Sequence, residues 1–142
     1  MNDASAPLTK EELQAHLDHS PFIASLGLKV TETDPARQLV TMTCEMKPEF
    51  ERGAGTGQWH GGPIAAIIDT VGDYALAMGL RRGLPTVNFR VDYLRPAVKT
   101  KLIITAVVRR AGKSVGVVDV DVFNEQKALI AVGRATYSTL AS

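Results

Sequence analysis

Cysteine is nearly absent from this sequence of 142 residues, with Cys44 the only one. A single thiol cannot build an intramolecular disulfide framework or a cysteine-rich zinc site, and such cysteine usage fits a reducing compartment. Three histidines leave little from which to build a metal centre. We therefore expect no metal and a cytoplasmic location.

Net charge and long apolar runs are also missing. Sixteen lysines and arginines stand against fifteen aspartates and glutamates, a formal net charge of +1, whereas proteins that hold nucleic acid through bulk charge are strongly basic. No uninterrupted apolar run approaches the roughly 20 residues of a membrane span, and residues 1–7 lack the charged-then-apolar pattern of a signal peptide. We expect neither nucleic acid nor a membrane as a partner.

The composition is that of an ordinary globular domain, with 45% hydrophobic and 22% charged residues. A chain of this length is expected to fold as one domain that buries about 68% of its unfolded surface. We therefore expect a single domain over residues 1–142, with a flexible arm at residues 1–7.

Two helices are predicted. Thr9 and Glu12 form a capping box that opens a short helix at residues 8–20, which should end before Pro21 because the residue preceding a proline avoids helical angles. Residues 61–80 are apolar nearly all round, which is typical of a helix buried on most faces.

Most of the remaining chain alternates between apolar and polar residues with a period of two, the pattern of half-buried strands. Short turns between the later segments favour an antiparallel meander. The predicted strands are 26–30, 39–46, 86–93, 102–108, 114–123 and 129–137, and a glycine-containing loop at 48–59 precedes the long helix.

The lengths of these elements suggest how they pack. A helix of about 19 residues and strands of about 9 residues both span roughly 30 Å. One apolar helix and a sheet of equal length bury each other if the sheet curls around the helix, which is the α+β hotdog fold: about six antiparallel strands around one central helix, plus a short N-terminal helix. An exposed sheet edge invites pairing, so we expect at least a homodimer, with a tetramer of two dimers as a further option.

Two features of the long helix could carry chemistry. His60-Gly61-Gly62 leaves backbone N–H groups open at its positive end, which suits an oxyanion on a carbonyl, although glycines here can also serve packing. Asp69 is an acid in an apolar helix, where it either has a use or reaches a neighbouring hydroxyl or water; Asp73 is the competing acid.

Helix geometry adds a constraint on these two features. Gly61 and Asp69 lie about 12 Å apart along one helix. If both serve one substrate, they must come from two copies related by a two-fold axis, and the site then lies at the dimer interface.

The sequence resembles the phenylacetate-pathway (PaaI-like) hotdog acyl-CoA thioesterases from about Phe22 to its end. The resemblance rests on His60-Gly61-Gly62 followed by Asp69-Thr70, and on the Tyr93-Leu94-Arg95-Pro96 strand end. It implies that the Gly61 N–H binds the thioester oxygen, that His60 shapes the helix entry, that Asp69 of the partner chain is nucleophile or general base, and that Thr86 orients water.

The resemblance also raises two points about substrate binding. Many members carry an asparagine six residues before the histidine, where this chain has Ala54, and Thr56 or Gln58 could take its place. The family's equivalent turn often meets coenzyme A phosphates, which assigns that role to Arg109, Arg110, Lys113 and Ser114, although solvated hairpin charges explain the cations equally well.

The leading hypothesis is therefore an acyl-CoA thioesterase for a small or medium aliphatic or aromatic acyl group, with coenzyme A as part of the substrate and no cofactor. Two alternatives stay open. A hotdog hydratase or dehydratase would use His60 beside a carboxylate, and a non-catalytic acyl-CoA-binding protein would be compatible with Ala54.

Overall fold

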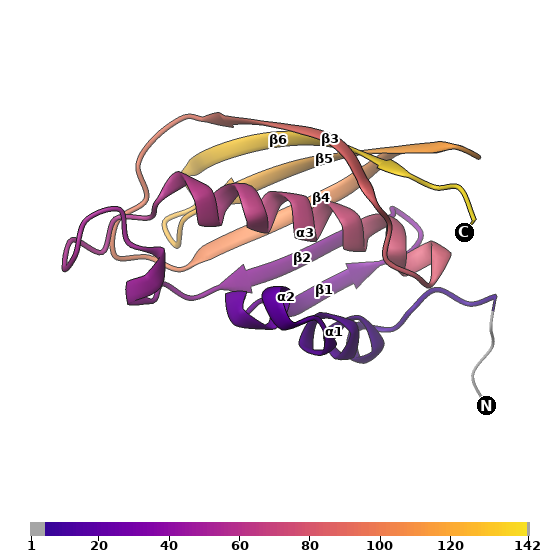
Figure 1. The fold of residues 1–142 in the computed structure, drawn as a ribbon, viewed down its shortest axis with the longest axis horizontal. Helices are drawn as coiled ribbons and strands as arrows, with labels where there is room; N and C mark the ends of the chain where they lie inside the picture. The colour runs from indigo at the N-terminus through magenta and orange to yellow at the C-terminus, as the bar shows by residue number, and fades with distance from the viewer. Residues whose placement is uncertain (1–4, 142) are drawn as a thin grey trace.

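The computed structural model describes residues 5–141 and shows one antiparallel sheet wrapped around a long helix (Figure 1). The helix, α3, spans Gly61–Leu80. The six strands are β1 (Lys29–Asp34), β2 (Leu39–Cys44), β3 (Thr86–Tyr93), β4 (Leu102–Ala111), β5 (Val115–Phe123) and β6 (Leu129–Ser138). This arrangement confirms the predicted α+β hotdog fold.

The strand order in the sheet is β1-β2-β4-β5-β6-β3, and every neighbouring pair is antiparallel. β1 and β3 are therefore the edge strands. The bounds of β3 are those predicted, β5 and β6 differ by one residue, β4 runs to residue 111 rather than 108, and β2 ends at 44 rather than 46. The sequence therefore predicts both the first and the last residue of β3 correctly.

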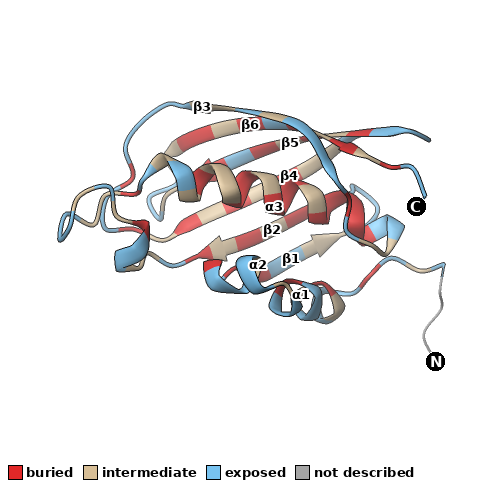
Figure 2. Cartoon of the chain, in the orientation of Figure 1, coloured by how far each residue is buried: buried red, intermediate tan, exposed pale blue. Residues whose placement is uncertain are grey.

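α3 lies against the concave face of the sheet and supplies much of the core, including Ile67, Ile68 and Val71, which are all fully buried (Figure 2). By length and composition α3 could cross a membrane, yet 61% of its apolar window is buried within the fold. Packing against the curled sheet therefore accounts for its hydrophobicity.

The N-terminal helix forms as predicted at its start. α1 spans Lys10–His19. The Thr9 hydroxyl accepts from the Glu12 N–H at 3.1 Å, and the Glu12 carboxylate accepts from the Thr9 N–H at 3.0 Å. The reciprocal pair is the predicted capping box, with helix bounds one to two residues inside the expected 8–20.

A second short helix, α2 (Pro21–Leu26), was not predicted. Proline ends the preceding helix and at the same time starts this one, because its missing N–H costs nothing in a first turn. Gly27 then ends α2 with φ +72°, a conformation that suits glycine. The prediction of a strand starting at residue 26 was therefore wrong, and β1 begins at Lys29.

The beginning of the described chain contacts the end of α3. The predicted flexible arm comprises residues 1–7, of which 1–4 lie outside the described residues. The Ala6 carbonyl accepts a hydrogen bond from the Arg81 guanidinium at 2.7 Å, and the Leu8 N–H donates to the Met78 carbonyl at 2.8 Å.

Candidate active site

The start of α3 presents one open backbone donor. His60 is the N-cap, and its Nδ1 accepts the Gly62 N–H at 3.0 Å. Pro63 has no N–H, so the first turn retains the Gly61 N–H, for which none of residues 5–141 supplies an acceptor. At the positive end of the helix, this N–H can bind a carbonyl oxygen that becomes negative.

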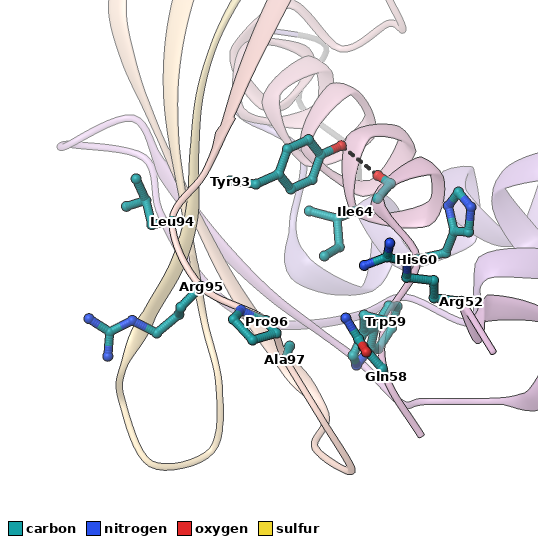
Figure 3. A pocket seen from close by; sticks show the side chains of 11 residues that line it. Arg52, Gln58, Trp59, His60, Ile64, Tyr93, Leu94, Arg95, Pro96 and Ala97 are labelled. Atoms are coloured by element: carbon teal, nitrogen blue, oxygen red, sulfur yellow. Dashed lines mark hydrogen bonds between the residues drawn. The ribbon is translucent and has the colours of Figure 1, made fainter. Parts of the chain in front are cut away.

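Gly61 is fixed against the end of β3. The Tyr93 hydroxyl donates to the Gly61 carbonyl at 2.6 Å (Figure 3). A Cβ at Gly61 would lie 3.2 Å from the Tyr93 ring and hydroxyl, so glycine permits this close approach. The open N–H is therefore held at a defined place beside Tyr93.

A cleft of about 520 Å³ opens at this place. In Figure 3, Arg52, Gln58 and Trp59 stand on one side of it and Leu94 to Ala97 on the other. Trp59 is buried, stacks on Phe50 at 5.2 Å between ring centroids, and donates its indole N–H to the Thr100 carbonyl. The aromatic wall is thus rigid and apolar.

The charge of the cleft has one sign. Arg52 and Arg95 line it, and no acidic residue is among the described residues that do so. Arg52 extends toward the start of α3, whereas Arg95 points away from the cleft (Figure 3). The Arg52 guanidinium beside a helix N-terminus attracts an anionic ligand.

Asp69 and Thr86 meet beside the middle of α3, away from its start. The Thr86 hydroxyl donates to Asp69 Oδ1 at 2.7 Å, and Asp69 is half-buried on the face of α3 that the sheet leaves uncovered. Neither residue lines the cleft. Eight residues of helix separate Asp69 from Gly61 by about 12 Å, and β3 separates Thr86 from Tyr93 by about 23 Å.

Asp73, the competing acid, has a structural role. Its Oδ1 accepts the Leu84 N–H at 3.0 Å, which ties α3 to the segment that leads into β3. Burial is the main cause that raises its pKa to about 7; the Leu84 hydrogen bond opposes this shift, and the charge of Asp69 adds to it to a smaller extent. Of the two acids, Asp69 is therefore the one that contacts a second candidate site residue.

Comparison with known proteins decides the family. The family model described as "Thioesterase superfamily" matches residues 56–131, more than half of the chain. The chain belongs to the thioesterase superfamily. The predicted enzyme class, thioester hydrolase, is the class of this family, and the family resemblance stated from the sequence is confirmed.

Individual relatives agree with this assignment. The human protein named acyl-coenzyme A thioesterase 13 is 37% identical over 66% of this chain and 69% of its own length. The Escherichia coli K12 protein named medium/long-chain acyl-CoA thioesterase YigI is 28% identical over 94% of this chain and 97% of its own. The structure of the E. coli PaaI protein shares the fold, with a TM-score of 0.78 and 24% identity over 93% of each chain.

The loop before His60 has no asparagine in this thioesterase, and the structure distinguishes the two substitutes suggested by the sequence. The Thr56 hydroxyl donates to the Gly53 carbonyl at 2.6 Å and accepts the Gln58 N–H at 3.2 Å, so it stabilises the loop. The Gln58 side chain lines the cleft instead. Glu51 closes the loop by accepting the Gly57 N–H at 2.6 Å.

The cations expected to meet coenzyme A lie far from the cleft of the same chain. Arg109, Arg110, Lys113 and Ser114 are exposed around the β4–β5 turn. β4 begins near the cleft, and seven residues along it place Arg109 about 23 Å from Leu102. One chain therefore brings together Gly61 and His60, and separately Asp69 and Thr86, but not these cations.

Two contributors to the site were missed by the sequence analysis. Arg52 lies on a loop whose conformation sequence alone does not give. Tyr93 was recognised only as part of a strand end, and its hydrogen bond to Gly61 depends on how β3 passes the start of α3.

Proposed function

We propose that this thioesterase hydrolyses acyl-CoA esters at sites shared by two copies of the chain. The observation that supports the proposal is the division of one chain into two half-sites. The open Gly61 N–H and the cleft lie beside Tyr93, where β3 ends, whereas Asp69 binds Thr86, where β3 begins.

Pairing of two β3 strands would unite the half-sites. Within the described residues β3 pairs only with β6, so its other edge is open. In an antiparallel pairing centred on the strand, Thr86 of one copy lies opposite Tyr93 of the other. Each Asp69 then approaches the Gly61 of the other copy.

Exposure of apolar side chains supports this dimer. On β3 and just after it, Val87 is 63% exposed, and Tyr93 and Leu94 are each 52% exposed. The less buried positions of α3, which include Asp69 and Asp73, also share one face of the helix. Exposed apolar residues beside an open strand edge mark an interface rather than a solvated surface.

The chemistry in this arrangement is base-assisted hydrolysis. The Asp69 oxygen not bonded to Thr86 takes a proton from water as the water oxygen attacks the thioester carbon, and the Thr86 oxygen accepts the second water hydrogen. The Gly61 N–H binds the resulting oxyanion. Collapse breaks the C–S bond, and the thiolate takes the proton from Asp69. Direct attack by Asp69 is the alternative: it forms a mixed anhydride and releases the thiolate, and ¹⁸O from water then enters the enzyme carboxylate in one turnover if water attacks the aspartyl carbon.

Gln58 completes the cleft. Its backbone N–H and carbonyl are used within the loop, by Thr56 and Arg52, while its carboxamide faces the cleft beside Trp59. A carboxamide can donate to a thioester oxygen and accept from water. We assign to Gln58 the polar contact that Ala54 lacks.

The substrate class follows from charge and wall chemistry. The anionic coenzyme A suits Arg52, and the dimer places the hairpin with Arg109, Arg110, Lys113 and Ser114 of the second copy at the same end as the cleft. Trp59 and Ile64 offer apolar contact to a small or medium aliphatic or aromatic acyl group. The reaction requires no cofactor beyond coenzyme A in the substrate, and we propose a cytoplasmic location.

A thiol-release screen over aliphatic and aromatic acyl-CoA esters tests the function. We expect turnover by the wild type, and a loss of about 10²–10⁴-fold in kcat for Asp69→Asn with the fold retained. Asp73→Asn is the matched control and should keep most of the activity. Release of no thiol from any ester, with tight acyl-CoA binding, would identify a binding protein instead, and hydration of crotonyl-CoA would identify a hydratase.

A further inference from the structure

A buried hydroxyl lies directly behind Asp69. Tyr137 on β6 is completely buried, and its hydroxyl donates to the main-chain carbonyl of Asp69 at 2.6 Å. In the register of β3 and β6, Tyr137 is the partner of Thr86. Tyr137 therefore contacts Asp69, the proposed base, directly. It is also the strand partner of Thr86, whose hydroxyl binds Asp69.

The helix leaves room for this hydroxyl at a single glycine. A Cβ added to Gly72 would lie 2.4 Å from the Tyr137 oxygen, far inside contact distance. The next atoms that it would meet, Cζ of Tyr137 and Cγ2 of Val120, lie at 3.4 Å, which is ordinary contact. A Cβ at Gly72 would thus clash with the Tyr137 oxygen, while its other neighbours lie at ordinary contact distance.

A backbone hydrogen bond next to Tyr137 joins the same two strands. The Ser138 N–H donates to the Pro85 carbonyl at 2.9 Å, next to the Thr86–Tyr137 pair. β6 is thereby joined both to the turn of α3 that carries Asp69 and to the beginning of β3. The distance between the Asp69 carboxylate and the Thr86 hydroxyl therefore depends on how β6 holds α3 and the start of β3 together.

We propose that Tyr137 is a positioning residue that fixes Asp69 against Thr86, and that Gly72 provides the space for its hydroxyl. The hydroxyl stays a donor because burial, and then the charges of Asp69 and Asp73, raise its pKa. A hydrogen bond to the Asp69 carbonyl fixes the Cα from which the carboxylate extends. Small misplacements of a catalytic group cost about 100-fold in rate.

The test rests on the proposed function and uses the full chain with an acyl-CoA ester that the wild type hydrolyses. Tyr137→Phe keeps the ring and removes only the hydroxyl. We expect kcat to fall about 10- to 100-fold while KM changes less than about twofold, because the substrate contacts are untouched. Tyr74→Phe is the control, since no hydrogen bond joins Tyr74 to Asp69 or Thr86 in residues 5–141.

A double-mutant cycle separates positioning from general damage. Gly72→Ala should lower kcat at least as much as Tyr137→Phe, because the new methyl group displaces the hydroxyl. Adding Tyr137→Phe to Gly72→Ala removes that conflict, so the double variant should recover to within about threefold of Tyr137→Phe alone. A purely structural role predicts additive losses and no recovery.

The outcomes are distinguishable from failure of the function itself. If the wild type is active and Asp69→Asn is not, but Tyr137→Phe matches the wild type or the two losses add, the positioning role is overturned and the thioesterase remains. If the wild type hydrolyses no acyl-CoA ester, the proposed function fails; recovery of thermal stability in the double variant relative to Gly72→Ala still tests the predicted contact.

Discussion

Replacing Asp73 with asparagine changes a charge without changing the hydrogen bond that joins α3 to the start of β3. Asparagine Oδ1 can still accept the Leu84 N–H, which Asp73 accepts at 3.0 Å. In the wild type, burial raises the pKa of Asp73 from its ordinary value of 3.8 to about 7. The folded chain therefore holds a proton that the unfolded chain releases at lower pH.

The sign and size of the effect follow from that difference. Below pH 3.8 both states are protonated and Asp73 costs nothing. Between 3.8 and 7 only the unfolded state ionises, so the free energy of unfolding falls as pH rises, by at most about 1.36 kcal/mol per pH unit. From pH 5 to 7 the loss is about 2 kcal/mol, and it levels off above 7. In Asp73→Asn this loss disappears.

Thermal unfolding from pH 5 to 8 at one fixed protein concentration measures the effect. For a chain of this size about 2 kcal/mol corresponds to about 8 °C in Tm. The Tm of Asp73→Asn minus that of the wild type should therefore rise by about 8 °C between pH 5 and pH 7 and then stay constant. Parallel curves for the two proteins across this range would refute the reasoning, since the carboxyl would then titrate alike in both states.

Two further predictions concern the cleft and the dimer. Gln58→Ala should lower kcat about tenfold in steady-state thiol release, and Ala54→Asn in the same background should restore part of it; an unaffected kcat would remove Gln58 from the reaction. Val87→Glu places an unpaired carboxylate among the exposed apolar side chains of the proposed interface, so the dimer should dissociate in size-exclusion chromatography and activity should fall with it, whereas Val87→Thr should behave as the wild type. A fully active Val87→Glu monomer would contradict the shared site.

The central helix and the edge strand could be predicted from sequence because local signals set their limits. His60 and Gly61 mark the start of α3 through a cap and open donors, and the period-two pattern of residues 86–93 gives β3 without error. α2 was missed because Pro21 was interpreted as a stop signal alone, although the same residue also begins a helix. Because a proline can end one helix and also begin the next, the local sequence pattern does not show whether a second helix follows.

The site was harder to predict because its contacts join distant segments. The sequence identified Asp69 as an acid out of place, and the structure shows its partner hydroxyl on Thr86, 17 residues away. That contact depends on the curl of the sheet and on an irregular register between Thr86 and Asn88. Tyr137 lies 68 residues from Asp69, and no spacing pattern links the two.

β3 sets the geometry of the proposed site from both ends. The Tyr93–Gly61 hydrogen bond ties the oxyanion donor to the last residue of the strand, and the Thr86–Asp69 hydrogen bond ties the base to its first residue. The distance between donor and base across a dimer is then determined by how two β3 strands align. A shift of the pairing by two residues moves the half-sites apart by about 7 Å, which is more than a thioester can bridge. In the proposed dimer, the register of this pairing therefore decides whether donor and base meet, and we expect the apolar side chains of β3 to support activity through assembly.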